Sequence, residues 1–345
     1  MQNILKILYQ GNSLNYNQCQ TLLDSIIKKQ ISPIQITAAL ISMKMRGETY
    51  EEIIASSKIL LNKYKQPFSQ LNTLFADITG TGGDDKNTIN ISTISAIVAA
   101  TCNAKIIKHG NYSISSTTGS IDLLKKEYLD LKDYELQELK CFNELGLCFL
   151  CASRYYTIFR DVMNIRRQLN TPTLFNIIGP LINPARPPLA LIGVYKKALL
   201  PLMIQALKEL QYHRALVVYC NGIDEIGLHA PTNVFELHDD GYINDYILTP
   251  SDFGLTSYSI NTLYCNSRQT AHNYMINILK GQGQPAHNAV IAANVALLLK
   301  LFGYNNLRSN VLLILDKIHQ GIPYNTYYLY QNRLQKNHDL FKHNT

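Results

Sequence analysis

The stretch from Asp77 to Thr93, DITGTGGDDKNTINIST, decides the fold class of this chain because three kinds of local structure meet in it. A short apolar segment, typical of a buried strand, leads into a turn with Gly80, Gly82 and Gly83, and a helix rich in hydroxyl side chains follows. Glycine has no side chain, so the turn can bend sharply and direct backbone N–H groups at an anion above the helix N-terminus. The pattern predicts a phosphate-binding loop between a strand and a helix.

This loop differs from the two best-known nucleotide-binding loops. It lacks the Lys-Ser/Thr ending of a nucleoside triphosphatase loop, and it lacks the acidic residue that follows a dinucleotide-binding loop by roughly twenty positions. We therefore expect a different phosphate-containing ligand.

A second polar loop, KHGNYSISSTTGS at residues 108–120, follows the next predicted strand. Its lysine supplies a positive charge, and its asparagine and serines supply neutral donors, a mixture that suits phosphate oxygens and ribose hydroxyls. Serine and threonine also fill ordinary loops, but two such loops in consecutive strand–helix units favour a binding role.

Two adjacent carboxylates, Asp224 and Glu225, lie in NGIDEIG at residues 221–227, directly after the apolar segment RALVVYC. Hard oxygen ligands of this kind suit Mg²⁺, which keeps most of its water and accepts phosphate oxygens as further ligands. Such a pair by itself is most often a solvated turn. Beside two phosphate loops it predicts a magnesium site.

The order of apolar patterns predicts the fold class, α/β. Up to about residue 65 the spacing is helical, as in Ile34, Ala38, Ile41 and Met45, with Ser32-Pro33 as cap and first turn, which predicts a small N-terminal all-helical domain. Short apolar runs then alternate with helical stretches: FADIT, AKIIKH, LCFLCA, LALIGVY and RALVVYC. This alternation predicts a larger α/β domain with a central, mostly parallel sheet flanked by helices, and ligands of such sheets bind at the carboxyl ends of the strands.

The expected domain limits are residues 1–70 for the helical domain, and 71–164 with 191–345 for the larger α/β domain. Residues 171–188, TPTLFNIIGPLINPARPP, are rich in Pro, Gly and Asn and predict an ordered connection. We expect residues 165–190 to complete the helical domain.

Composition is that of an ordinary soluble globular protein: 345 residues, 46% of them hydrophobic, with a formal net charge of +7. The Lys and Arg residues are scattered, which makes nucleic-acid binding unlikely. No apolar run is long enough to span a membrane, the N-terminal stretch does not resemble a secretory signal, and the seven cysteines lie mostly in apolar segments. Cys148 and Cys151 are expected in the core rather than on a metal. These features predict a cytoplasmic protein.

The motifs GTGGD, NIST, KHGN, TGS, LFNIIGPLINPARPP and GIDE occur in an order and spacing that resemble the anthranilate phosphoribosyltransferase family over nearly the whole chain. The resemblance implies transfer of the phosphoribosyl group from phosphoribosyl pyrophosphate (PRPP) to the amino group of anthranilate, the second step of tryptophan synthesis from chorismate. It also implies Mg²⁺, with two ions per active site, a homodimer formed through the helical domain, and a possible association with anthranilate synthase subunits.

Site residues follow from the resemblance at matching positions. Those expected around PRPP are Gly80, Gly83, Asp84, Thr88, Asn90, Ile91, Ser92, Thr93, Lys108, His109, Gly110, Asn111, Tyr112, Ser113, Ile114, Ser115, Ser116 and Ser120. Gly80, Asn111 and Arg166 are expected to bind anthranilate, with His109 lining that site, and Ser92, Asp224 and Glu225 are expected to serve the metal ions. No residue is assigned as a general acid or base, because an arylamine is already neutral at pH 7 and needs positioning more than deprotonation.

The chain departs from the family pattern at four places. Tyr112 and Pro172 replace common arginines, Tyr156 stands where a histidine is usual, and Asp85 adds a negative charge to the first loop. Three alternatives therefore stay open: a relative that binds nucleic acid, a catalytically decayed relative, and an enzyme like pyrimidine nucleoside phosphorylase.

Overall fold

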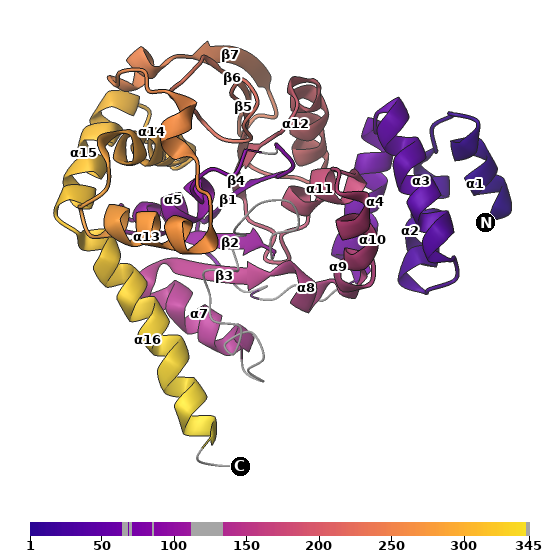
Figure 1. Cartoon of the computed structure of the whole chain (residues 1–345), viewed down its shortest axis with the longest axis horizontal. Helices are drawn as coiled ribbons and strands as arrows, with labels where there is room; N and C mark the ends of the chain where they lie inside the picture. The colour runs from indigo at the N-terminus through magenta and orange to yellow at the C-terminus, as the bar shows by residue number, and fades with distance from the viewer. Residues whose placement is uncertain (64–67, 69–70, 85, 112–133, 343–345) are drawn as a thin grey trace.

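The protein consists of a helical bundle and a larger α/β part built on one central sheet (Figure 1). The structure is a computed structural model that describes residues 1–63, 68, 71–84, 86–111 and 134–342. The fold class expected from the sequence is confirmed.

Four helices form the N-terminal bundle: α1 (Gln2–Tyr9), α2 (Tyr16–Ile27), α3 (Pro33–Arg46) and α4 (Tyr50–Lys63). The predicted cap of α3 is confirmed, because the Ser32 hydroxyl accepts a hydrogen bond from the Gln35 N–H while the Gln35 side chain accepts one from the Ser32 N–H. Asn15 and Gln18 form the same reciprocal pair at the start of α2. Each pair satisfies two backbone groups that a helix N-terminus leaves without partners.

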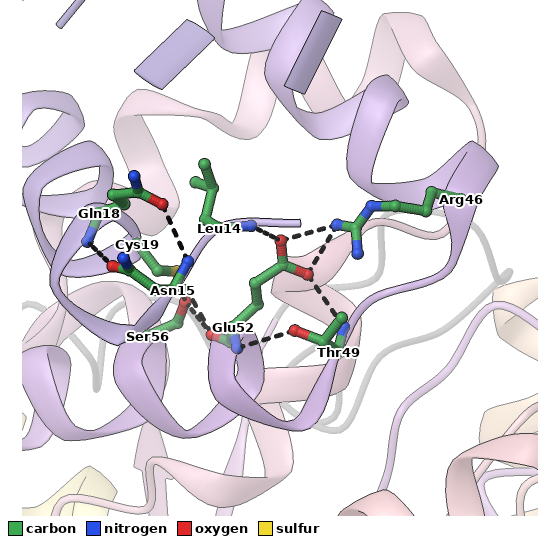
Figure 2. A network of polar contacts seen from close by, with 8 residues as sticks. All are labelled: Leu14, Asn15, Gln18, Cys19, Arg46, Thr49, Glu52 and Ser56. Carbon is green, nitrogen blue, oxygen red and sulfur yellow. Dashed lines mark hydrogen bonds and ion pairs between the residues drawn. The ribbon is translucent and has the colours of Figure 1, made fainter. Parts of the chain in front are cut away.

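The buried carboxylate of Glu52 on α4 ties the bundle together (Figure 2). Its two oxygens accept hydrogen bonds from the backbone N–H groups of Leu14 and Thr49, both at 2.9 Å, and from the guanidinium of Arg46 at 2.7 and 2.8 Å. These contacts join α4 to the loop before α2 and to the end of α3. A buried charge is tolerated here because both oxygens have several donors.

One apolar stripe of α3 faces outward. The helix buries Ile36, Leu40 and Met43, whereas Ile34 and Met45 are 81% and 80% exposed. The helical spacing that predicted this element was correct, but it marked the exposed stripe rather than the buried one.

Seven strands form the sheet in the described part of the chain, in the order β3-β2-β1-β4-β5-β6-β7. The first five are β1 (Ala76–Gly80), β2 (Ile106–Gly110), β3 (Leu147–Cys151), β4 (Leu189–Gly193) and β5 (Arg214–Tyr219), and they pair in parallel. These are the five apolar runs predicted as strands. The chain moves outward from β1 to β3 and then returns to β4 on the other side of β1, so the topological switch point lies between β1 and β4.

An antiparallel hairpin of β6 (Thr232–Leu237) and β7 (Ile243–Leu248) extends the sheet beyond β5. The sequence reading did not include these strands. Residues in β6 alternate between buried and partly exposed, and β7 is mostly exposed, so neither forms the continuous apolar run of a buried parallel strand.

Helices cover the sheet. Helix α5 (Ile91–Ala100) contacts β1, β2 and β3, and the almost entirely buried α14 (Pro285–Leu301) packs on α5, β4 and β5. Helix α12 (Leu200–Glu209) lies between the sheet and α4 of the bundle (Figure 1). The other elements of this part are α7 (Tyr134–Leu145), η3 (Lys197–Leu199), η4 (Pro250–Phe253), η5 (Ile260–Leu263), α13 (Arg268–Leu279), α15 (Leu307–His319) and α16 (Ile322–Lys342).

Short helices connect β3 to β4 and lie beside the bundle (Figure 1). They are α8 (Ala152–Tyr155), α9 (Thr157–Asp161), α10 (Met163–Leu169), α11 (Leu174–Ile178) and η2 (Gly179–Leu181). Helix α9 contacts α2, α10 contacts α3, and α11 contacts α3 and α4. The segment thus brings side chains from the bundle side to the carboxyl end of the sheet.

All seven cysteines are unpaired and buried, including Cys148 and Cys151 on β3, as expected for core residues. Across the described residues, none of the helices has the length and apolar character needed to cross a bilayer.

Candidate active site

A pocket lies at the carboxyl ends of the strands, beside the switch point. Its walls come from the loops after β1, β2 and β5 and from the short helices after β3. Predicted site residues that line it are Gly80, Gly83, Asp84, Thr88, Asn90, Ser92, Thr93, His109, Gly110, Asn111, Arg166, Asp224 and Glu225. Residues from four separate parts of the chain therefore meet in one place.

Three carboxylates, from the loops after β1 and β5, lie close together in this pocket. Asp84, Asp224 and Glu225 each place an oxygen within 4.8 Å of the others. Burial raises the pKa of Asp224, and burial together with the charges of Asp224 and Asp84 raises the pKa of Glu225. Like charges held this close favour a divalent cation, which relieves their repulsion. The sequence reading placed Asp84 at PRPP and did not include it among the metal ligands.

Two glycines let the Asp224 segment lie directly across the strand ends. Gly80 and Gly193 are paired at the last position of β1 and β4. A Cβ atom on Gly80 would lie 2.2 Å from Asp224 Oδ2, and one on Gly193 would lie 1.4 Å from the Asp224 carbonyl oxygen. Asp224 Oδ2 also accepts a hydrogen bond of 2.6 Å from the Gly82 N–H. The carboxylate is therefore fixed against the phosphate loop.

Lys108 lies behind the pocket wall. Its ammonium group is fully buried and donates to the Ile78 carbonyl and, at 3.1 Å, to the Ser92 hydroxyl. Burial lowers the pKa of Lys108 to about 8, although Asp77, Glu225 and Asp224 oppose this shift. Lys108 thus orients Ser92 and compensates the carboxylates, without itself lining the pocket.

A buried arginine from the short helices after β3 also lines the pocket. Arg166 on α10 is 6% exposed, and its guanidinium carbon lies 6.0 and 5.9 Å from the ring centroids of Phe159 and Phe175. Burial alone lowers its pKa to about 10, since no charged partner within the described residues opposes the shift. A desolvated guanidinium beside a pair of aromatic rings suits a planar aromatic carboxylate.

His109 forms a neutral part of the wall. Burial lowers its pKa to about 3, and its ring donates a hydrogen bond to the Gly179 carbonyl. Its Nε2 has no hydrogen-bond partner among the described residues. The ring packs edge to face on Tyr156, with centroids 6.1 Å apart, and the Tyr156 hydroxyl donates to the Ile182 carbonyl at 2.7 Å. Tyr156, one of the departures from the family pattern, therefore supports His109.

Not every predicted site residue lies at the pocket. Ile91 is buried at the start of α5 and, like Lys108, is not part of the lining. Six residues predicted to lie around PRPP are outside the described residues, as is Asp85: Tyr112, Ser113, Ile114, Ser115, Ser116 and Ser120.

The sequence reading also missed lining residues, among them Lys86, Phe159, Phe175, Asn176 and Pro180. Lys86 lies inside the quoted glycine-rich stretch and could have been included from its position alone. The aromatic residues carry no local signal, because they resemble ordinary core residues until α9 and α11 bring them to the arginine.

Comparison with known proteins places this architecture in a family. Residues 2–63 match the "Glycosyl transferase family, helical bundle domain", and residues 72–324 match the "Glycosyl transferase family, a/b domain". The chain is 64% identical over 324 residues to the anthranilate phosphoribosyltransferase of Blochmanniella pennsylvanica, covering 94% of each chain.

Solved structures agree. The anthranilate phosphoribosyltransferase of Thermus thermophilus has a TM-score of 0.84 at 29% identity, covering 96% of this chain and 99% of its own. The enzyme from Saccharomyces cerevisiae, in complex with PRPP and Mg, has a TM-score of 0.85 at 23% identity, covering 97% of each chain, and shows the shared fold. The chain therefore belongs to the anthranilate phosphoribosyltransferases, within the glycosyl transferases that combine a helical bundle with an α/β domain.

Proposed function

We propose that the protein transfers the phosphoribosyl group of PRPP to the amino group of anthranilate, giving N-(5-phosphoribosyl)anthranilate and pyrophosphate, the second step of tryptophan synthesis from chorismate. The observation that carries this proposal is a single pocket whose lining combines a phosphate loop and three carboxylates with a buried arginine beside two aromatic rings. Relatives of high identity carry the same activity in their names. None of these observations favours nucleic-acid binding or a nucleoside phosphorylase.

At the donor end, Asp84, Asp224 and Glu225 would hold magnesium, with the Ser92 hydroxyl beside them. The donor set fits, because it consists of hard oxygen atoms within 4.8 Å of one another. When bound, Mg²⁺ neutralises charge on the pyrophosphate that leaves. Two ions per site would suit the two sides of a pyrophosphate, and a structural relative from yeast was solved with PRPP and Mg.

At the acceptor end, Arg166 would bind the anthranilate carboxylate, and Phe159, Phe175 and Pro180 would enclose its ring. Gly80 and Asn111, which also line the pocket, would contact anthranilate as well. Neutral His109 excludes water without adding charge. The amino group is thereby directed at the anomeric carbon of PRPP, and binding geometry supplies much of the rate.

The proposal is tested by loss of anthranilate fluorescence on addition of PRPP and Mg²⁺ to the purified protein. Wild-type protein should consume anthranilate only with both additions. Asp224→Asn combined with Glu225→Gln should raise the Mg²⁺ requirement and lower turnover by about a hundredfold or more, because metal-held charge stabilisation is lost.

A matched control is the adjacent acidic pair in the exposed β6–β7 turn, Asp239→Asn combined with Asp240→Asn, which should leave turnover within about twofold of wild type. Unchanged kinetics in the Asp224/Glu225 variant would remove these residues from the metal site. Absence of consumption by the wild type, despite measurable PRPP binding, would favour a decayed relative.

We further propose that the protein is a homodimer through the helical bundle. The support is the apolar stripe of α3 formed by Ile34, Ala38, Ile41 and Met45, whose two end residues are about four-fifths exposed and whose two middle residues are partly exposed. A contiguous apolar surface of this kind is typical of a protein–protein contact. Bundle helices would then meet without covering the pocket, which lies at the sheet end.

Two remaining expectations concern the cellular setting. We propose a cytoplasmic location, supported by seven buried, unpaired thiols, which persist in a reducing compartment. We also propose association with anthranilate synthase subunits, which produce the anthranilate that accepts the phosphoribosyl group. Co-sedimentation of the two purified proteins tests this association, and separate sedimentation at micromolar concentration would contradict it.

A further inference from the structure

The Asn176 side chain on α11 makes three hydrogen bonds that connect different parts of the pocket. Its Oδ1 accepts from Arg166 Nη2 at 3.0 Å and from the Thr173 N–H at 3.1 Å. Its Nδ2 donates to the Thr81 carbonyl, in the phosphate loop, at 3.2 Å. One amide therefore contacts Arg166, the N-terminus of its own helix α11, and the phosphate loop.

These bonds fix the orientation of the amide. Turning it over would put its NH₂ group against two N–H donors and its oxygen against a carbonyl, so all three bonds would be lost. Arg166 is buried and has no charged partner within the described residues, so Asn176 is the polar contact that sets its direction. The neutral oxygen of Asn176 orients the guanidinium by a hydrogen bond and leaves the positive charge of Arg166 available to a substrate carboxylate.

The contact to Thr81 continues to the carboxylate cluster through a single peptide group. The carbonyl of the Thr81–Gly82 peptide accepts from Asn176, and the N–H of the same peptide donates to Asp224 Oδ2 at 2.6 Å. The peptide plane is thus held from both sides. The path from Arg166 through Asn176 and this peptide to Asp224 fixes the distance between the two ends of the pocket.

Building on the proposed function, we propose that Asn176 is a positioning residue for the acceptor: it holds Arg166 in register with the phosphate loop, so that the amino group of anthranilate reaches PRPP. Asn176 does not need to contact the reacting atoms for this role. Its effect therefore falls on the acceptor more than on the donor.

Asn176→Ala removes the contacts to Arg166 and Thr81, and Asn176→Asp keeps an acceptor for Arg166 but pairs it with a fixed negative charge. We expect Asn176→Ala to raise the KM for anthranilate by about tenfold to a hundredfold, the range for a lost hydrogen bond to a charged group. We expect Asn176→Asp to raise it as well, because the new carboxylate competes with that of anthranilate for Arg166. The KM for PRPP should stay within about threefold of wild type, because the Gly82–Asp224 contact remains. Steady-state kinetics with each substrate varied in turn measures this split.

Asn310→Ala is the matched control for a purely structural effect. Asn310 is also buried, donates to the carbonyls of Ala296 and Tyr304, and lies outside the pocket lining. It should lower the melting temperature and leave both KM values unchanged.

Two results would overturn the inference: an unchanged anthranilate KM in both Asn176 variants, or equal changes in the KM values of both substrates. Failure of the proposed function would look different, because the wild-type protein itself would then consume no anthranilate.

Discussion

At the scale of single residues, the site depends on places where a side chain is missing. Gly80 and Gly193 end neighbouring strands, and their hydrogen atoms leave the space that the Asp224 backbone and carboxylate occupy. A carboxylate that must be buried, close to two others and bonded to the Gly82 N–H can be placed only if this space stays open.

We predict that Gly80→Ala lowers kcat/KM for PRPP by about a hundredfold or more, because the new methyl group displaces a carboxylate expected to hold the metal. Its Cβ would lie 2.2 Å from Asp224 Oδ2. Kinetics over a range of Mg²⁺ concentrations measures the effect, which should appear as a weakened response to the metal.

Gly179→Ala is the control for the folding effect of such a change. Gly179 has an ordinary helical backbone and no neighbouring atom within 4 Å of an added Cβ. The melting temperature of the Gly179→Ala protein should therefore match that of the wild type. A Gly80→Ala protein with wild-type Mg²⁺ dependence would contradict the role of this glycine.

The sequence allowed Gly80 to be predicted but not Gly193. Gly80 lies in a turn whose glycines indicate a phosphate-binding loop. Gly193 ends an ordinary apolar strand, and its need to be glycine arises from a segment about thirty residues further along the chain, which only the sheet order brings across it. Asn176 was hidden for the same reason, because two of its partners, Arg166 and Thr81, come from other segments.

At the scale of elements, buried carboxylates hold helices in place. Glu138 on α7 is fully buried, accepts from the Tyr330 hydroxyl of α16 at 2.6 Å, and accepts from the Phe149 N–H of β3 at 2.9 Å. Burial raises the pKa of Glu138 from 4.5 to about 7, against the opposing effect of these donors. The contact between α16 and the sheet is therefore sensitive to pH.

The direction of this pH dependence follows from the raised pKa. Between about pH 4.5 and 7 the folded protein keeps a proton on Glu138 that the unfolded chain releases. The resulting stabilisation is complete below this window and is lost as pH rises through about 7. Relative to Glu138→Gln, we expect the free energy of unfolding of the wild type to fall by on the order of 3 kcal/mol across the window.

Denaturant unfolding at several pH values measures this difference, and subtraction of the two curves removes other titrating groups. Glu135→Gln, an exposed change on the same helix, should follow the wild-type curve. Parallel curves for wild type and Glu138→Gln would show that Glu138 does not titrate differently on folding.

The Glu52 network supports a second prediction for an element, the N-terminal bundle. Glu52→Ala leaves the N–H groups of Leu14 and Thr49 without their acceptor and Arg46 without its carboxylate. We expect a loss of about 2–4 kcal/mol in the free energy of unfolding of the bundle. Denaturation followed by circular dichroism measures it. Glu51→Ala, exposed and adjacent, should stay within about 0.5 kcal/mol, and equal losses in both variants would contradict the network's role.

The sequence predicted five strands because buried parallel strands are short, continuous apolar runs. The β6–β7 hairpin was missed because residues such as Asn233 and Asp245 lie within strands that are only partly buried. For α3, periodicity gave the element, but two apolar stripes compete on one helix, and only packing decides which becomes core.

At the scale of the whole molecule, the exposed stripe on α3 lies at the opposite end of the protein from α13 to α16 (Figure 1). We predict that Ile34→Glu combined with Met45→Glu converts a dimer to a monomer, because two charges would have to be buried at the contact. Light scattering coupled to size-exclusion chromatography measures the mass. Leu312→Glu, equally exposed on α15 at 72%, is the control and should leave the mass unchanged. A wild-type monomer, or a dimer that survives the double substitution, would place the contact elsewhere.

The central claim, that one pocket joins a PRPP end to an anthranilate end, is tested most directly by following pyrophosphate release and anthranilate loss in the same reaction, for wild type and Arg166→Gln. We predict release and loss in a one-to-one ratio for the wild type. For Arg166→Gln we predict an anthranilate KM raised by about tenfold or more with a PRPP KM within about threefold, because the lost guanidinium is proposed to bind anthranilate and not PRPP. Pyrophosphate release that does not require anthranilate, or an Arg166→Gln change that weakens PRPP as much as anthranilate, would contradict the account.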